Sequence, residues 1–236
     1  MERDTILFDL DGTLLPIDFD EFLHRYFKSL TGEFTDIAEP DRFIEVLLKA
    51  TSDMIDNQGE RLNREVFMDS FFSLIKVDDR EALMRRFDRF YEEKFPLLRK
   101  GLVIDTTPAR IIDFLKKKGY QLIIATNPVF PLEAITERIS WGRLDPDDFV
   151  LITHYENMHY CKPNPGFFRE IMDKLDLKPE RCIMVGNDMQ EDMVAGKLGM
   201  ATYLVEDHLI DRHRESFIPD WRGTLNELEL YLKEIF

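Results

Sequence analysis

A chain of 236 residues, 44% of them hydrophobic and 33% charged, suits one large globular domain or a core with a smaller inserted domain. Its formal net charge of −15 argues against a general positive field that would bind nucleic acid or an anionic membrane, so an anionic substrate would need a local cation. The N-terminal residues lack a signal-peptide pattern, no apolar run approaches the length of a membrane span, and Cys161 and Cys182 suggest no disulfide framework, so we expect a cytoplasmic protein.

The first predicted element is a buried strand, Thr5–Phe8, which runs into the sequence Asp9-Leu10-Asp11-Gly12-Thr13. A short apolar or β-branched run before a glycine turn is typical of a parallel strand. In an extended segment the side chains of Asp9 and Asp11 point to the same side, where two carboxylates repel each other unless a cation or a proton intervenes. Oxygen ligands at this density suit Mg²⁺, although a plain Asp-Gly turn explains the stretch equally well when it is taken alone.

From Asp18 to about residue 95 the apolar residues recur at helical spacing, and no strand pattern interrupts them. The spacing predicts four helices, over about 18–32, 40–56, 63–75 and 79–95. The many aromatic residues of this region share that spacing, which favours the packed core of a helix bundle over a cofactor site.

After Pro96 the pattern alternates between helices and short buried strands. The predicted elements are a helix from Thr107 to Gly119, a strand over 121–125, a short helix over about 131–139, a strand over 149–152, a helix over 164–175, a strand over 182–185, a helix to about Leu198, a strand over 201–205 and a last helix that begins with the capping box Thr224–Glu227. We assign no role to the polar stretch from Glu206 to Arg222.

This order predicts an α/β fold, with a doubly wound, Rossmann-like parallel sheet of five or more strands and an inserted all-helical domain. The insertion interrupts the alternation directly after the first strand. We therefore expect residues 1–15 and 97–236 to form the core and residues 16–96 the insertion, with hinges near Leu15 and Pro96–Gly101.

Polar side chains follow four of the predicted strands, and the carboxyl ends of parallel strands meet at one edge of a sheet. Each group has an ordinary explanation by itself, such as a helix cap, a turn or a solvated lysine. Together they supply a carboxylate nucleophile, a second carboxylate for proton transfer, a hydroxyl, an ammonium group and metal ligands, which is the equipment for phosphoryl transfer. The candidate residues are Asp9, Asp11, Thr126, Asn127, Lys162, Asp188 and Asp192.

The ordered set of Asp9-Leu10-Asp11-Gly12-Thr13-Leu14, Ala125-Thr126-Asn127, Lys162-Pro163 and Gly186-Asn187-Asp188-Met189-Gln190-Glu191-Asp192 resembles the four motifs of the haloacid dehalogenase superfamily, in particular its phosphoglycolate phosphatase-like hydrolases. The resemblance covers residues 5–205, and the helical insertion is similar to the mobile cap of that superfamily. It implies a phosphoric monoester hydrolase that acts on a small phosphorylated metabolite through an aspartyl-phosphate.

The resemblance also implies a role for each matching residue. Asp9 would be the nucleophile, and Asp11 would protonate the leaving alcohol and then deprotonate the attacking water. Thr126 and Asn127 would bind the phosphoryl oxygens, and Lys162 would neutralise the phosphate and hold Asp9. Magnesium would be bound by Asp9, the backbone carbonyl of Asp11 and Asp188, with Asp192 in support or acting through water.

Several alternatives stay open at this point. A phosphomutase with the same core would keep the phosphoryl group instead of passing it to water, and the motifs do not separate the two. A dehalogenase is less expected because that branch lacks the second acid, here Asp11. A phosphonate hydrolase would need a buried lysine in the cap, and neither Lys28 nor Lys49 is marked as one. A phosphoryl-responsive signalling module is disfavoured by the large helical insertion and by the late position of Asp188.

The sequence does not identify the substrate or the oligomeric state. His24, Arg25 and Lys28 lie on the polar face of the first predicted helix of the cap, where they could contact a distal polar group of a substrate. A solvated helix face is the more economical interpretation of these three residues. The size of the cap favours a small soluble substrate over a protein or a nucleic acid.

Overall fold

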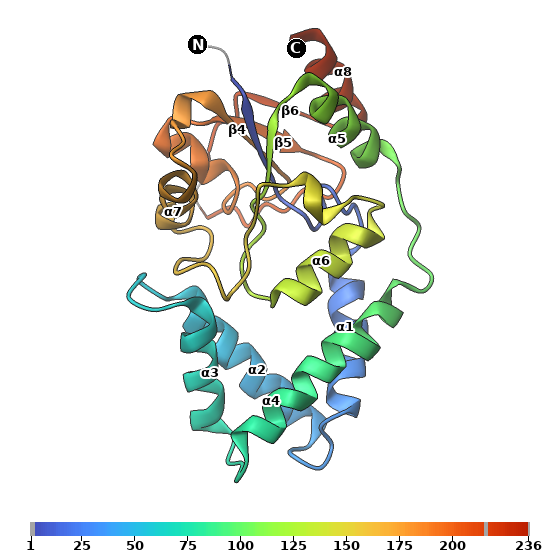
Figure 1. The fold of residues 1–236 in the computed structure, drawn as a ribbon, viewed down its shortest axis with the longest axis vertical. Helices are drawn as coiled ribbons and strands as arrows, with labels where there is room; N and C mark the ends of the chain where they lie inside the picture. Colours follow the sequence, from blue (N-terminus) through green and yellow to red (C-terminus); the bar gives the residue numbers. More distant parts are fainter. Residues whose placement is uncertain (1–2, 215–216, 236) are drawn as a thin grey trace.

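The computed structural model of the protein describes residues 3–214 and 217–235, so Met1, Glu2, Glu215, Ser216 and Phe236 of the predicted core lie outside the described residues. Within the described residues, six parallel strands form one sheet in the order β3-β2-β1-β4-β5-β6 (Figure 1). The strands are β1 (Thr5–Phe8), β2 (Gln121–Ile124), β3 (Leu151–Ile152), β4 (Cys182–Gly186), β5 (Ala201–Val205) and β6 (Trp221–Gly223). The predicted Rossmann-like sheet of five or more strands is therefore confirmed.

Strand β1 lies in the middle of the sheet and determines where the other strands end. Phe8 is level with Ile124 of β2 and with Val185 of β4, so the loops that follow these three strands leave the same edge of the sheet. Every residue of β1 and β4 is buried, which explains their continuous apolar sequence.

Helices cover both faces of the sheet. Successive residues of each strand point to opposite faces, and the central strands carry apolar side chains on both, so both faces must be buried. Ile6 and Phe8 belong to one hydrophobic core, whereas Leu7 belongs to a second one on the other face. The first core includes residues of α5 (Thr107–Lys118), α6 (Leu132–Trp141) and α8 (Leu225–Ile235), and the second includes residues of α7 (Pro165–Leu175). The predicted capping box of α8 is present, since Thr224 and Glu227 exchange hydrogen bonds.

Four α-helices lie between β1 and α5, as the spacing predicted. They are α1 (Phe19–Gly32), α2 (Pro40–Ile55), α3 (Asn63–Leu74) and α4 (Arg80–Arg89). Asp18 and Asp79 cap α1 and α4 by accepting hydrogen bonds from backbone N–H groups. The helix expected over 79–95 changes at Phe90 into a π-helical turn and then into a 3₁₀ turn over Phe95–Arg99, because Pro96 has no N–H to continue the α-helical ladder.

Three other segments differ from the sequence-based expectation. The strand expected over 149–152 begins only at Leu151, since Phe149 closes a 3₁₀ turn by bonding to Pro146. The helix expected before Leu198 is a 3₁₀ helix over Met193–Leu198. In the turn just before it, the carboxylate of Asp188 accepts hydrogen bonds from the N–H groups of Gln190 and Glu191, which are therefore not part of a helix. Strand β6 lies at the end of the polar stretch to which no role was assigned.

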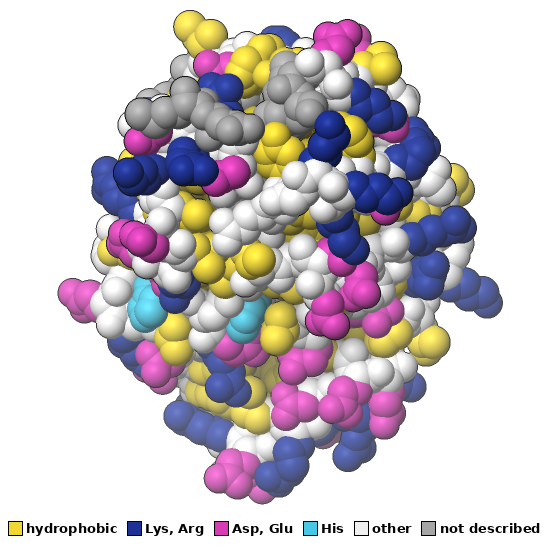
Figure 2. All heavy atoms as spheres, turned by 45° about the horizontal axis from the view of Figure 1, so that its top comes forward, with side chains coloured by type: hydrophobic (Ala, Val, Ile, Leu, Met, Phe, Trp, Pro, Cys, Tyr) yellow, Lys and Arg dark blue, Asp and Glu magenta, His cyan; other side chains and the backbone are white. Residues whose placement is uncertain are grey.

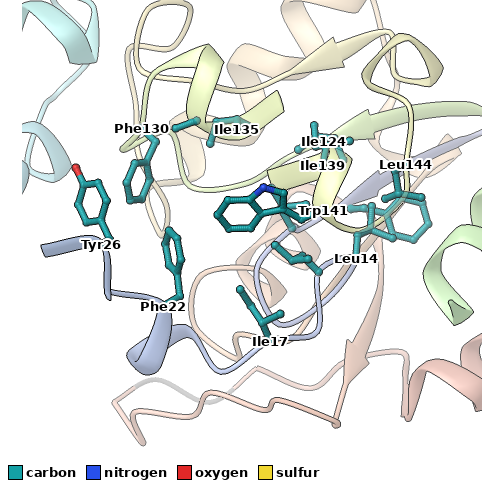
Figure 3. Packing of buried hydrophobic residues seen from close by; sticks show 14 of the residues in the cluster. Leu14, Ile17, Phe22, Tyr26, Ile124, Phe130, Ile135, Ile139, Trp141 and Leu144 are labelled. Carbon is teal, nitrogen blue, oxygen red and sulfur yellow. The ribbon is translucent and has the colours of Figure 1, made fainter. Parts of the chain in front are cut away.

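Aromatic side chains join the base of the helical insertion to the core (Figure 3). Trp141 at the end of α6 is fully buried and stacks on Phe95, with ring centroids 5.4 Å apart. Phe22 of α1 meets the edge of Trp141 at 5.9 Å. This cluster lies beside the two chain segments that connect the insertion to the sheet.

The insertion touches the core at a second place, on the loop between α2 and α3. The side chain of Asn57 donates to the carbonyl of His159 at 2.8 Å, and the backbone N–H of Asn63 donates to the carbonyl of Met158 at 2.9 Å. The Asn63 amide also reaches the sulfur of Cys161 at 3.3 Å. We call the contact of Asn57 and Asn63 with residues 158–161 the asparagine contact.

The surface mixes both signs of charge. Figure 2 shows acidic and basic side chains interspersed over one face, with hydrophobic side chains between them. No helix in the described part of the chain is both long enough and apolar enough to cross a bilayer.

Candidate active site

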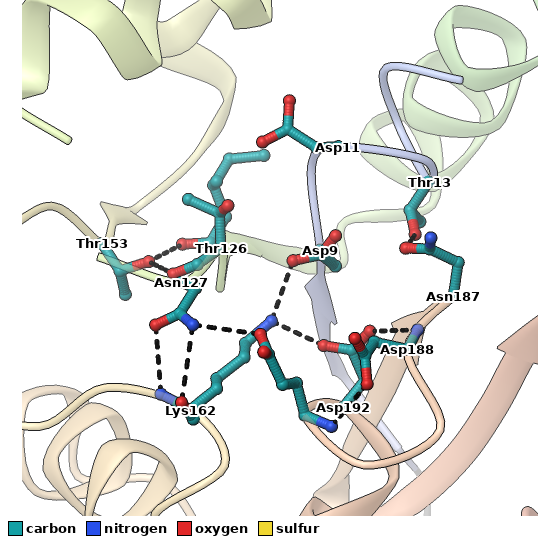
Figure 4. A network of polar contacts seen from close by, with 12 residues as sticks. Asp9, Asp11, Thr13, Thr126, Asn127, Thr153, Lys162, Asn187, Asp188 and Asp192 are labelled. Carbon is teal, nitrogen blue, oxygen red and sulfur yellow. Dashed lines mark hydrogen bonds and ion pairs between the residues drawn. The ribbon is translucent and has the colours of Figure 1, made fainter. Parts of the chain in front are cut away.

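The structure brings the seven candidate residues together at the carboxyl edge of the sheet (Figure 4). Six of them line one cavity of about 710 Å³ between the sheet edge and the helical insertion, and the seventh, Lys162, lies behind Asp9. The cavity-lining candidates are Asp9, Asp11, Thr126, Asn127, Asp188 and Asp192. His24, Arg25 and Lys28 do not line this cavity, and Arg25 instead donates to the carbonyl of Lys100.

Lys162 connects two carboxylates that come from different strands. Its ammonium group lies 2.9 Å from Asp9 Oδ1 and 2.6 Å from Asp192 Oδ1, and the side chain is 1% exposed. Burial opposes the charged form, but the carboxylates of Asp192 and Asp9 outweigh it and raise the pKa of Lys162. A permanent positive charge therefore lies next to the carboxylate at the end of β1.

Asp192 supports this lysine with one oxygen and the local backbone with the other. Its Oδ2 accepts a hydrogen bond from the N–H of Asp188 at 2.9 Å. A Cβ on Gly186 would lie 2.1 Å from the same oxygen, so only glycine leaves room for the carboxylate. Asp192 therefore ties Lys162 to the loop after β4, which is a supporting role in the site.

Asp11 is held by an arginine that the sequence analysis did not identify. Arg138 of α6 donates from Nη1 to Asp11 Oδ2 at 2.6 Å, and the arginine side chain is 1% exposed. Burial raises the pKa of Asp11 to about 6, while Arg138 opposes that shift. Among the buried side-chain atoms of the described residues, Asp11 Oδ1 has no hydrogen-bond partner, so one oxygen of this carboxyl group remains available.

A signal for Arg138 is present in the sequence. Arg138 shares the buried face of α6 with Ile135 and Ile139, at helical spacing. A charged residue on an apolar helix face needs a buried partner, and such a position can be found by periodicity alone.

The loop after β1 depends on a glycine. Gly12 has φ +80°, and a Cβ there would lie 2.3 Å from the side-chain nitrogen of Asn187. Beside it, Thr13 donates to Asn187 Oδ1 at 3.0 Å. The first and fourth motifs are thus packed directly against each other.

The loop after β2 carries Thr126 and Asn127. The Asn127 amide donates to Glu191 Oε2 at 3.0 Å, and its oxygen accepts from the N–H of Lys162 at 3.2 Å. The carbonyl of Thr126 accepts from the hydroxyl of Thr153 at 2.6 Å. The Asn127 side chain therefore fixes the loop that carries Lys162, and Thr126 lines the cavity beside it.

Arg212 and Glu191 also belong to the site and were missed by the sequence analysis. Arg212 donates to Asp188 Oδ2, and its second terminal nitrogen lies 3.3 Å from Glu191 Oε1. Burial and the neighbouring Asp188 raise the pKa of Glu191 to about 7. Arg212 lies in the polar stretch without an assigned role, and a backbone bridge between Asp188 and Ile210 holds that stretch against the site.

The oxygen donors around Asp9 fit a hard divalent cation. Within the described residues, no three Asp, Glu, His or Cys side chains form a ready-made metal cluster. A cation here would depend on the carboxylates of Asp9 and Asp188, the carbonyl of Asp11, and oxygens of water or substrate. Mg²⁺ is usually bound in this way, by one or two protein carboxylates together with oxygens of water or substrate.

Known proteins are similar to this chain in sequence. Residues 3–199 match the family described as haloacid dehalogenase-like hydrolase. The pyrophosphatase PpaX of Bacillus cereus (strain Q1) is 24% identical over 223 residues, which cover 94% of this chain and 92% of that protein. The glyceraldehyde 3-phosphate phosphatase of Methanothermobacter thermautotrophicus is 32% identical over 127 residues, 53% of each chain.

The fold also matches solved structures. The magnesium-bound HAD-hydrolase YfnB of Bacillus subtilis superposes with a TM-score of 0.59 at 20% identity, over 98% of this chain and 99% of that chain. The crystal structure of YfnB reveals an interdomain movement in that protein.

Proposed function

The chain belongs to the haloacid dehalogenase-like hydrolases, and we propose that it is a magnesium-dependent phosphatase that hydrolyses a small phosphate monoester through an aspartyl-phosphate on Asp9. The observation that carries this proposal is the buried ion pair of Lys162 with Asp9 at the floor of the cavity. It joins a nucleophile to a cation that can neutralise a phosphoryl group, with the acid Asp11 two residues away.

In the first step, a carboxylate oxygen of Asp9 attacks the phosphorus atom, and the bond from phosphorus to the alcohol oxygen breaks. Asp11, in its protonated form, gives its proton to the departing oxygen, so the alcohol leaves neutral. A pKa of about 6 leaves part of the Asp11 population protonated at mildly acidic to neutral pH. Lys162 balances the negative charge of the phosphoryl group and of Asp9.

In the second step, Asp11 acts as a base. It removes a proton from a water molecule, whose oxygen attacks phosphorus, and the bond between phosphorus and Asp9 breaks. Inorganic phosphate leaves, and Asp9 and Asp11 return to their starting states. One group can serve as acid and then as base because the first step leaves it deprotonated.

Asp9, Asp188 and the carbonyl of Asp11 would hold Mg²⁺, which supplies positive charge against the phosphoryl oxygens when it is bound. Thr126 and the backbone of its loop would bind the same oxygens. Asp192 keeps Lys162 in place and is not required as a direct ligand.

Residues 16–96 would act as a cap over a core made of residues 1–15 and 97–236. The cap and core together enclose the cavity, and its enclosure limits the access of bulk water. The π-helical turn over Phe90–Lys94, just before the return to the core, carries Tyr91 and Glu92 of the cavity lining, and such turns are frequent at functional sites.

The test is release of inorganic phosphate from a panel of phosphate monoesters with Mg²⁺, comparing the wild-type protein with Asp9→Asn. The variant keeps the shape of the side chain and removes the nucleophile, so release should fall to background. Asp173→Asn, an exposed change on α7, is the matched control and should not alter release. Equal release by wild type and Asp9→Asn would rule out the mechanism, and an isomerised product without free phosphate would indicate a phosphomutase.

A further inference from the structure

The cavity above Asp9 has two chemically different halves. Its floor, at the strand ends, holds the carboxylates, Thr126 and Asn127. Its roof is formed by the four helices of the cap, and all but four of the roof residues are apolar or aromatic. The four polar exceptions are Thr51, Arg64, Asp88 and Glu92. At about 710 Å³, the cavity has the size of a pocket for a drug-sized molecule rather than for a two- or three-carbon alcohol.

The apolar roof follows from the helical repeat. In α2 the lining residues Leu47, Thr51 and Ile55 recur every fourth position, so they form one stripe that faces the floor. Leu48 and Ile55 also line the cavity and are 52% and 37% exposed, so part of this apolar surface is accessible to a ligand. The sequence analysis favoured a packed bundle core for the aromatic stripe of this region. Tyr26, Phe67 and Phe87 of that stripe do pack in the core, and they also line the cavity.

The roof can also adapt to the shape of a ligand. Met68 of α3 and Met84 of α4 line the cavity beside Phe67, and methionine side chains adjust easily to different apolar surfaces. An apolar wall of this kind recognises a hydrocarbon body by contact and excluded water rather than by hydrogen bonds.

The charges around the roof disfavour a second anionic group. Asp88, Glu92 and Glu133 line the cavity and are exposed at its edge, whereas Arg64 is the one Lys or Arg among the described cap residues that line it. A carboxylate or a second phosphate on the substrate would meet these acidic groups away from the phosphate site.

We propose that the substrate is a phosphate monoester of a predominantly apolar alcohol of medium size, uncharged apart from its phosphate. The proposal rests on the proposed phosphatase function and specifies its leaving group. A short polar alcohol would leave most of the apolar roof in contact with water, while a hydrocarbon body would cover it.

The test is a series of straight-chain alkyl phosphates, from ethyl to octyl phosphate, with Mg²⁺. Their alcohols are similar leaving groups, so differences in kcat/KM report contact with the roof. Burial of one methylene corresponds to about a fourfold gain, and kcat/KM should rise by up to about this factor per carbon until the cavity is full. Glycerol 3-phosphate and 2-phosphoglycolate should be poorer substrates than butyl phosphate.

A variant on the roof links this selectivity to the cavity. Leu48→Gln places a polar group on the roof at a half-exposed site where the fold tolerates it, and should reduce the ratio of octyl to ethyl phosphate turnover by at least about threefold. Leu230→Gln makes the same change on α8, at a residue 63% exposed and outside the cavity lining, and should leave the ratio unchanged.

The outcomes separate this proposal from the one on which it rests. If phosphate release depends on Asp9 but is flat or falls with chain length, or if 2-phosphoglycolate is preferred, the substrate class is wrong and the phosphatase stands. If no ester releases phosphate in an Asp9-dependent way, the proposed function fails. Calorimetric binding of octyl and ethyl phosphate to Asp9→Asn then still tests the roof, and equal affinities would overturn the apolar leaving group.

Discussion

Arg138 and Asp11 form a buried ion pair across 127 residues of sequence, with 2.6 Å between Nη1 and Oδ2. The guanidinium group of Arg138 also lies 4.4 Å from the ring centre of Phe130 and 5.5 Å from that of Phe22. Phe22 belongs to α1 of the helical insertion, so a cap residue helps to enclose the arginine that holds the proposed acid.

This ion pair predicts a pH effect. Asp11 must be protonated to release the alcohol, so the rate should fall as pH rises through its pKa of about 6. Arg138 favours the ionised form of Asp11, and Arg138→Met should therefore raise that pKa and move the alkaline decline to higher pH. The measurement is the pH profile of kcat/KM on one alkyl phosphate, whose own titration is the same for both proteins. In Asp11→Asn the decline assigned to Asp11 should disappear along with most of the activity, and an unshifted profile in Arg138→Met would contradict the assignment.

Lys162 should have separable roles in stability and catalysis. Lys162→Met leaves Asp9 and Asp192 facing each other without their cation, which should cost about 3–5 kcal/mol of unfolding free energy. Adding Asp192→Asn removes one of the uncompensated charges and should recover part of that loss without restoring phosphate release. Chemical denaturation and activity assays on the single and double variants check this. Recovery of activity in the double variant would show that Lys162 acts only as a structural partner.

The close approach of Gly186 to Asp192 gives a steric prediction. In Gly186→Ala the new Cβ would displace the Asp192 carboxylate, so Lys162 would lose its support and kcat should fall by at least about tenfold. Gly32→Ala, at the end of α1, is the matched control, since a Cβ there meets no atom within 4 Å. Steady-state kinetics on both variants, together with circular dichroism to verify the fold, distinguish the outcomes. A fully active Gly186→Ala protein would show that Asp192 can move without effect.

Arg212 should compete with a cation for the carboxylate of Asp188. Arg212→Gln removes the charge and keeps a polar side chain, so Mg²⁺ affinity measured by calorimetry should increase severalfold. Arg222→Gln, a change of another arginine that is paired with Glu206 outside the cavity, is the control. Weaker Mg²⁺ binding in Arg212→Gln would mean that the arginine positions Asp188 for the metal instead of opposing it.

The sequence predicted the sheet and the seven candidate residues because both depend on local patterns. Buried strands and the polar residues that follow them are adjacent in sequence, and the rules of parallel sheets bring their ends together. Arg212 was not predicted because its partner Asp188 is distant in sequence and an isolated arginine resembles an ordinary surface residue. The spacing of Arg138 with Ile135 and Ile139 marks a buried arginine, but it does not reveal that the partner is Asp11, which is 127 residues away. The apolar roof of the cavity was not predicted, because helical periodicity identifies an apolar face but does not show whether that face packs against a neighbour or lines a cavity.

The asparagine contact restricts how the helical insertion can move relative to the core. The connecting segments and the Trp141 cluster lie on one side of the cap, and the asparagine contact lies at the α2–α3 loop, away from them (Figure 1). An insertion attached only at the connecting segments could rotate about them, but the asparagine contact is a second attachment that opposes this rotation. A rotation of the insertion about the connecting segments would therefore require Asn57 and Asn63 to exchange their partners for water. Residues 158–161, which these asparagines hold, run directly into Lys162, so one segment of backbone both contacts the insertion and carries the lysine that pairs with Asp9.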